Sequence, residues 1–216
     1  MNSARLDDYK EVAPRGTLDL LSRLGETLRG RRFVHVNAAR FGGGSAELLG
    51  SIAVMMQDLG IDLAWEVAVG DPHVYAAVSR LEAGLAGREE VLTDAALRAY
   101  WEAAAVNAAS LPLDADVVMT YDLAPLPLVR HRPSRGRWVW RSSGDLSQAQ
   151  RRIWYLVRKE IEAYDAAVFS LPKFARRLAI PTLIVNPSID PLSEKNRDLA
   201  PREVRQVVDR LVIPRV

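Results

Sequence analysis

The stretch that decides the fold is Arg31-Arg32-Phe33-Val34-His35-Val36-Asn37-Ala38-Ala39-Arg40-Phe41-Gly42-Gly43-Gly44-Ser45-Ala46-Glu47-Leu48-Leu49. An apolar strand leads directly into three glycines, and the glycines lead directly into an amphipathic helix. Such a turn places backbone N–H groups at the N-terminus of a helix, where the helix dipole favours anions. Glycine also permits positive φ and lets a ligand approach the backbone closely. The stretch therefore predicts a turn that binds a nucleotide phosphate or a sugar.

Two other interpretations of this glycine turn stay open. A tight turn from strand to helix needs glycine for packing alone, without any ligand. A dinucleotide site is the second interpretation, because Glu66 lies near the end of the next expected strand, where an acid binds the ribose. Against it, the spacing is not G-x-G-x-x-G, the third glycine on the helix is missing, and Ser45 is polar.

Strands alternate with helices along the whole chain. The hydrophobic patterns predict strands at residues 33–37, 63–69, 116–120, 138–141, 166–170 and 182–185. Helices are expected at 17–28, 46–59, 72–85, 93–109, 147–161 and 203–211. This alternation is typical of an α/β fold with a doubly wound, mostly parallel sheet.

The composition limits the classes of function. The chain of 216 residues has 29 basic and 27 acidic residues, which gives a net charge of +2, and the basic residues are scattered along it. This balance does not favour nucleic acid as a partner. The absence of cysteine excludes disulfides and thiolate metal sites, and three scattered histidines do not predict a metal cluster. No apolar run is long enough to span a membrane, so we expect a cytoplasmic protein.

Polar residues follow three of the expected strands directly. They are the segment from Gly42 to Glu47, Asp122, and the pair Arg141 and Asp145. Ligands bind beyond the carboxyl ends of the strands in open α/β sheets, so we expect these residues to line one cleft. The two aspartates suit hydrogen bonds from sugar hydroxyls, with Arg141 pairing with one of them. Each aspartate taken alone also fits a turn or helix cap.

Trp138 and Trp140 alternate along one expected strand and therefore share one face of the sheet. A stacking platform for a ligand is one interpretation of such a pair. Burial in the hydrophobic core is the interpretation that the spacing favours.

Several motifs together resemble one enzyme family. They are Asp8-Tyr9-Lys10-Glu11-Val12, Val34-His35-Val36-Asn37 with the glycines and Ala46-Glu47, Trp138-Val139-Trp140-Arg141, Tyr164-Asp165-Ala166-Ala167-Val168-Phe169-Ser170 and Pro187-Ser188-Ile189-Asp190-Pro191-Leu192-Ser193-Glu194-Lys195-Asn196. In this order they resemble the N-terminal half of the trehalose glycosyltransferring synthases. These are retaining, two-domain GT-B glycosyltransferases that join a nucleotide-diphosphate glucose to free glucose.

The resemblance implies the organisation and the ligands of the chain. Residues 1–216 are expected to form one acceptor-side domain, the Rossmann-like half of a GT-B fold. Residues 1–30 would be a helical extension, and residues 187–216 a junction toward a C-terminal domain that this chain lacks. The substrates implied are a sugar and a nucleotide sugar, without a cofactor or metal. The bare interdomain face predicts self-association into a homo-oligomer.

The predicted substrate-binding residues are Gly42, Gly43, Gly44, Glu47, Asp122, Arg141 and Asp145, and no catalytic residue is assigned. Two departures from the family pattern bear on the reaction. Where the family has His-Asp-Pro-Gln-Pro, this chain has Tyr121-Asp122-Leu123-Ala124-Pro125, and where the family has Trp-Arg-Cys-His-Ile-Asp, it has Trp140-Arg141-Ser142-Ser143-Gly144-Asp145. Both aspartates are kept and both histidines are replaced. A non-catalytic module that binds a sugar or a partner chain is therefore the main alternative to an enzyme domain, and a nucleotide-cofactor domain is the second.

Overall fold

The computed structural model describes residues 4–210 as a parallel α/β fold. Its six strands are all parallel, in the order β2-β1-β3-β4-β5-β6. They are β1 (Arg32–Asn37), β2 (Asp62–Val67), β3 (Val117–Tyr121), β4 (Arg137–Ser142), β5 (Ala166–Phe169) and β6 (Thr182–Ile184). The predicted fold class is confirmed, and each strand lies within two residues of its predicted position.

Helices connect the strands. The α-helices are α1 (Thr17–Leu28), α2 (Gly44–Asp58), α3 (Pro72–Leu85), α4 (Asp94–Ser110), α5 (Arg151–Ile161) and α6 (Pro201–Arg210). Short 3₁₀ helices are η1 (Leu6–Glu11), η2 (Leu126–His131), η3 (Pro172–Phe174) and η4 (Glu194–Asn196). The predicted terminal helix extended to Leu211, which lies outside the described residues.

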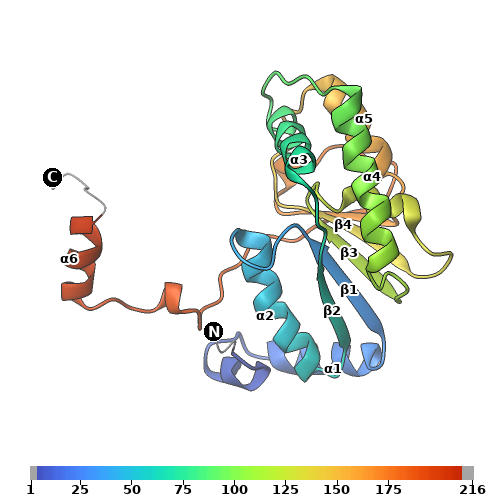
Figure 1. The fold of residues 1–216 in the computed structure, drawn as a ribbon. Coiled ribbons are helices and arrows are strands. Elements are labelled where there is room, and N and C mark those ends of the chain that lie inside the picture. The colour runs from blue at the N-terminus through green and yellow to red at the C-terminus, as the bar shows by residue number, and fades with distance from the viewer. Residues whose placement is uncertain (1–3, 211–216) are drawn as a thin grey trace.

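The two faces of the sheet carry different layers of helices. Figure 1 shows α3, α4 and α5 gathered on one side of the strands and α2 on the other. The buried side chains of Val34 and Val36 in β1 belong to the main core cluster, together with residues of α3, α4 and α5. Because side chains alternate along a strand, His35 between these valines belongs to the α2 side.

Trp138 and Trp140 are the largest fully buried side chains in the described part of the chain, each with 0% exposure. The ring of Trp140 meets Phe169 edge to face at a centroid distance of 5.8 Å. This result confirms the core interpretation of the tryptophan pair. Neither ring has a face open to a ligand.

Helix α5 begins later than its sequence pattern predicts. The sequence predicts a helix over residues 147–161, but the helix starts at Arg151 with Gln150 as N-cap. Ser147 instead donates its backbone N–H to Asp145 Oδ1 at 2.8 Å, within the turn that precedes the helix. The aspartate two residues earlier therefore captures the serine backbone for a turn.

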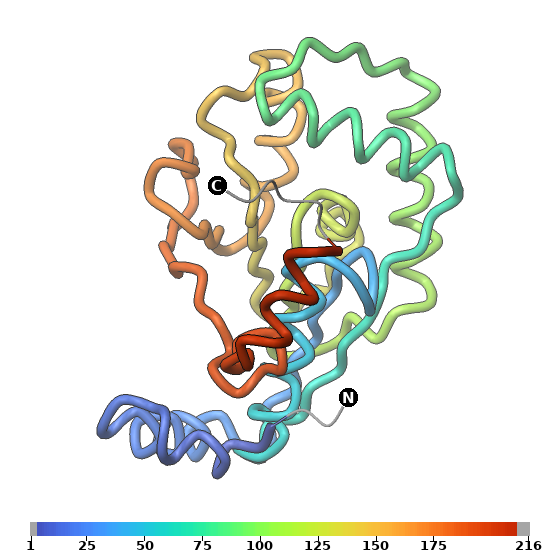
Figure 2. Tube along the Cα trace, turned by 90° about the vertical axis from the view of Figure 1, so that its left-hand side faces the viewer, coloured from blue at the N-terminus to red at the C-terminus, as the bar shows by residue number. Residues whose placement is uncertain are grey.

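The segment after β6 returns to the N-terminal part of the chain. Asp190 accepts hydrogen bonds from the Tyr9 hydroxyl at 2.9 Å and the Ser51 hydroxyl at 3.0 Å. It thereby ties the returning segment to η1 and α2, whereas α6 beyond it stands away from the sheet (Figure 1). Seen from the side, the N-terminal segment lies at one end of the molecule and α3 and α4 at the other (Figure 2).

The helices of the described residues can be compared with the requirements for crossing a membrane. Within residues 4–210, none of the helices has both the length and the apolar character that a crossing of the bilayer requires.

A pair of glycine substitutions tests how tightly the strands are packed. Gly136 precedes β4 with φ +89°, and a Cβ there would meet the carbonyl oxygen of Ala115 well inside van der Waals contact. We expect Gly136→Ala to lower the free energy of unfolding by about 3 kcal/mol, from the left-handed backbone and the overpacking together. Urea unfolding followed by circular dichroism measures this loss.

Gly16 provides the matched control for that measurement. Its φ is +79°, but a Cβ there has no neighbour within 4 Å. Gly16→Ala should therefore cost only the backbone term of about 1–2 kcal/mol. Equal losses for the two variants would contradict the close contact between Gly136 and Ala115.

Candidate functional site

The predicted site residues lie at the carboxyl edge of the sheet, at or after the ends of β1, β3 and β4. Asp122 follows β3 directly and joins the other two segments. Its Oδ2 accepts a hydrogen bond from the hydroxyl of Ser45 at 2.9 Å, at the start of α2. Its Oδ1 accepts from both the backbone N–H and the hydroxyl of Ser143, at 2.9 and 2.8 Å. One carboxylate thus connects the glycine turn to the loop after β4.

The backbone of Asp122 is equally constrained. It has φ +59°, the only positive φ of a non-glycine residue in the described chain. Its N–H donates to the carbonyl of Arg141 at 2.8 Å, and its own carbonyl accepts from Trp140 Nε1 at 2.7 Å. Aspartate tolerates this left-handed conformation better than most residues. The hydrogen bond from the buried Trp140 indole therefore fixes the Asp122 backbone and, through it, the position of the carboxylate.

A cavity of about 320 Å³ opens beside Asp122 at this edge. Three carboxylates contribute to its lining, from Glu82, Asp122 and Asp145. The rest of the lining consists of Leu85, Ala86, Leu123, Ser142, Ser143, Gly144 and Leu146. The volume lies at the small end of the range for sites that bind small molecules. Its lining combines apolar side chains with acceptors of hydrogen bonds.

The three carboxylates differ in their electrostatic surroundings. Hydrogen bonds from the backbone and side chain of Ser147 lower the pKa of Asp145. Loss of solvation raises the pKa of Glu82, and the negative charge of Asp122 raises it further. Within the described residues, no group of three or more His, Cys, Asp or Glu side chains is placed to hold a metal ion.

Glu82 is the member of this cavity that the sequence analysis missed. It lies in the last turn of α3, and no strand end precedes it. Packing of α3 against α5 brings it to the cavity, with Gln150 donating its backbone N–H to the Gly84 carbonyl at 2.8 Å. The local sequence carries no signal for this placement.

The glycine turn shares the edge but does not line the cavity. Gly42 and Gly43 have φ of +78° and +77°, and a Cβ on any of Gly42, Gly43 or Gly44 would find no neighbour within 4 Å. The turn is therefore open to solvent. Glu47, in the first turn of α2, forms an ion pair with Lys195 at 2.8 Å.

Arg141 behaves differently from its prediction. Among the described residues its side chain forms no ion pair or hydrogen bond, so the expected pairing with Asp122 or Asp145 is wrong. Alternation along β4 explains this result, because Arg141 belongs to the opposite face from Trp140. Its charge acts there on the buried pair of His35 and Tyr121.

That pair joins β1 to β3. The Tyr121 hydroxyl and His35 Nδ1 are 2.8 Å apart, and both residues are at most 5% exposed. Burial and, secondarily, the charge of Arg141 lower the pKa of His35 from 6.5 to about 4. His35 is therefore a neutral hydrogen-bond partner of Tyr121 at neutral pH.

The fold and the site define a class of protein: a Rossmann-like α/β domain with a carboxylate-lined cavity beyond its strands. Residues 35–176 match the family model described as trehalose synthase, N-terminal domain. The chain is 34% identical over 210 residues to the trehalose synthase of Thermococcus litoralis. It is 33% identical over 213 residues to that of Pyrococcus horikoshii and 30% over 215 residues to that of Rubrobacter xylanophilus.

These matches show the family. Each covers 95% of this chain and 51% of the relative, so the chain spans about half the length of the curated relatives it matches. The chain belongs to the family of trehalose synthase N-terminal domains.

The buried histidine makes stability depend on pH. The pKa of His35 is lower in the folded chain than in the unfolded one, so below pH 6.5 protons bind preferentially to the unfolded state. The contribution of His35 is therefore complete above pH 6.5 and is lost as the pH falls toward 4. Between neutral pH and pH 5 we expect a loss of about 2 kcal/mol in the free energy of unfolding.

Urea unfolding of the wild-type chain and of His35→Gln at several pH values measures this dependence. The difference between the two chains isolates His35 from the carboxylates, which titrate in both. Parallel pH curves for the two chains would show that His35 does not have the lowered pKa.

Proposed function

We propose that this chain is the acceptor-side domain of a retaining glycosyltransferase that transfers glucose from a nucleotide-diphosphate glucose to a sugar acceptor such as glucose. Membership of the trehalose synthase N-terminal family supports the reaction class. The observation that carries the proposal is the Asp122 carboxylate. It lines the cavity and also accepts a hydrogen bond from Ser45, at the start of the helix that follows the glycine turn.

The cavity has the chemistry that a monosaccharide requires. Sugar hydroxyls donate hydrogen bonds, and carboxylates accept them strongly. Protein donors already engage Asp122 at both oxygens, but Oδ2 accepts only one of them, which leaves it room for a ligand hydroxyl. The side chains of Leu85, Leu123 and Leu146 offer apolar contact to the C–H groups of a sugar ring.

The glycine turn is proposed to face the phosphates or the glucose of the donor. Backbone N–H groups at the start of α2 would stabilise charge that develops on the leaving diphosphate. The donor and acceptor would then meet on either side of Asp122. In this proposal Asp122 orients the acceptor while it fixes the turn, which is a positioning role.

A sugar-binding module without catalysis is the alternative that one observation favours. Ser143 replaces the second histidine of the family pattern. It donates both its N–H and its hydroxyl to Asp122. Tyr121 replaces the first histidine and is buried against His35. Neither replacement offers an imidazole to the cavity. Binding of a sugar would be common to both functions, and only transfer distinguishes them.

Ligand-dependent heat stability tests the binding. We expect glucose or trehalose to raise the melting temperature, and Glu82→Gln and Asp122→Asn to weaken sugar binding about tenfold each, because a lost hydrogen bond to a charged group corresponds to such a factor. Glu89→Gln, an exposed change outside the cavity, is the control and should bind as the wild type does. A shift with NAD alone would favour the nucleotide-cofactor interpretation. The absence of any sugar effect would contradict the proposal.

Transfer by the chain alone is a separate test. We expect no appreciable glucosyl transfer from nucleotide-diphosphate glucose to glucose, because the resemblance assigns the grip on the nucleotide to the second domain. Chromatography of the products measures this activity. Trehalose formed at a rate typical of enzymes, on the order of 1 per second or more, would show that these residues suffice.

A further inference from the structure

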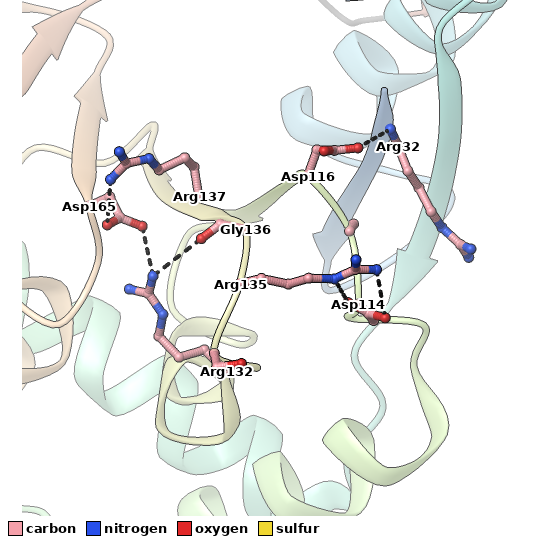
Figure 3. Close-up of a pocket in the computed structure, with 10 residues that line it drawn as sticks. Arg32, Asp114, Asp116, Arg132, Arg135, Gly136, Arg137 and Asp165 are labelled. Carbon is pink, nitrogen blue, oxygen red and sulfur yellow. Dashed lines mark hydrogen bonds and ion pairs between the residues drawn. The ribbon is translucent and has the colours of Figure 1, made fainter. Parts of the chain in front are cut away.

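A second cavity lies at the opposite, amino edge of the sheet. It has a volume of about 600 Å³, and its lining comes from segments that precede β1, β3, β4 and β5. Four arginines and three aspartates dominate the lining: Arg32, Arg132, Arg135, Arg137, Asp114, Asp116 and Asp165 (Figure 3). Arg132, Arg135 and Arg137 come from one segment around the start of β4, whereas Arg32 comes from the start of β1. Both segments line one cavity because parallel strands bring their amino ends to one edge.

The aspartates of this cavity are all engaged by the protein. Asp114 pairs with Arg135 through two contacts of 2.6 and 2.9 Å. Asp116 accepts from the backbone N–H of Arg32 and from the side chain of Arg31, both at 2.9 Å. These bonds lower the pKa of both carboxyls, so both stay ionised at neutral pH.

Asp165 is held in the same way. Its Oδ2 accepts from the backbone N–H of Trp138 at 2.7 Å and from Arg132 at 3.0 Å. Burial raises the pKa of Asp165, but these two partners outweigh it and bring the pKa below its ordinary value. The three acids therefore brace the cavity wall instead of presenting free acceptors.

Two guanidinium groups keep most of their donors unused. Arg32 engages Asp116 only through its backbone, and among the described residues its side chain makes no hydrogen bond or ion pair. Arg137 reaches Asp165 only at 3.5 Å, and its side chain is 77% exposed. Figure 3 shows these two arginines on opposite sides of the cavity, with Arg135 between them. The charges of Arg32 and Arg137 contribute least to the lowered pKa values of Asp114 and Asp165, whose main partners lie elsewhere.

We propose that this amino-edge cavity is a second ligand site, which binds a phosphate-bearing small molecule. Guanidinium groups match phosphate oxygens in geometry and charge, and the ion pairs with the aspartates hold two of the arginines in place before a ligand arrives. The cavity exceeds the size of a phosphate ion, and its remaining lining consists of the small residues Ala115, Ser134 and Gly136. A phosphorylated sugar has both the anion and the hydroxyl groups that this lining accommodates.

Isothermal titration calorimetry at constant ionic strength tests the site with inorganic phosphate, glucose 6-phosphate and glucose. We expect the wild-type chain to bind both phosphate compounds. The double variant Arg32→Gln/Arg137→Gln should bind them at least about tenfold more weakly, because each arginine loses charge-assisted hydrogen bonds. The variant should keep its melting temperature, since neither guanidinium holds the fold together. Arg98→Gln, exposed on α4 and outside the cavity, is the matched control and should bind as the wild type does.

The proposal is independent of the sugar site at the carboxyl edge. Glu82→Gln changes the carboxyl-edge cavity without touching the glycine turn and should leave the binding of inorganic phosphate unchanged, so failure at one edge is distinguishable from failure at the other. Equal phosphate affinity of the wild type and the double variant would overturn the assignment. Binding of a polyanion such as heparin without binding of either small phosphate compound would overturn it as well.

Discussion

Every strand of the sheet runs in the same direction, and the rest of the molecule depends on this constraint. Each loop after a strand reaches the carboxyl edge, and each loop before a strand reaches the amino edge. Residues separated by a hundred positions therefore meet without any local signal. The carboxyl edge collects the glycine turn, Asp122 and Asp145. The amino edge collects the arginines before β1 and β4.

The two edges use carboxylates in opposite ways. At the amino edge, each aspartate pairs with a guanidinium or a backbone N–H, and the arginines hold the unused donors. At the carboxyl edge, the cavity has no arginine in its lining, and Asp122 and Asp145 accept hydrogen bonds from serine hydroxyl and backbone N–H groups instead. This difference in charge pairing supports the two proposals, a neutral, hydroxyl-bearing ligand at one edge and an anion at the other.

Asp122 shows how the core of the domain reaches its surface site. Trp140 is fully buried, yet its indole N–H bonds the Asp122 carbonyl and stabilises a left-handed backbone at the surface. Ser143 stands where the resemblance implies a histidine, and its hydroxyl adds a bond to the same carboxylate. The replacement thus exchanges a group that can carry a proton for one that fixes the geometry of its neighbour.

The sequence by itself determined the succession of elements along the chain, which is strand, glycine turn, helix and again strand. It also determined that Trp138 and Trp140 are buried. Periodicity and glycine placement are local properties, so residues 31–49 and the later strands predicted the parallel α/β class correctly. Asp122 was also found from the sequence, because it follows a buried strand directly.

Only the tertiary structure decided which groups share a cavity. Glu82 reaches the carboxyl edge through the packing of α3 on α5, and Arg141 turns away from Asp122 because the tryptophans occupy the other face of β4. Lys195 reaches Glu47 only because Asp190 ties the returning segment to Tyr9 and Ser51. Such contacts depend on packing between distant segments, and a local pattern of residues contains no information about that packing.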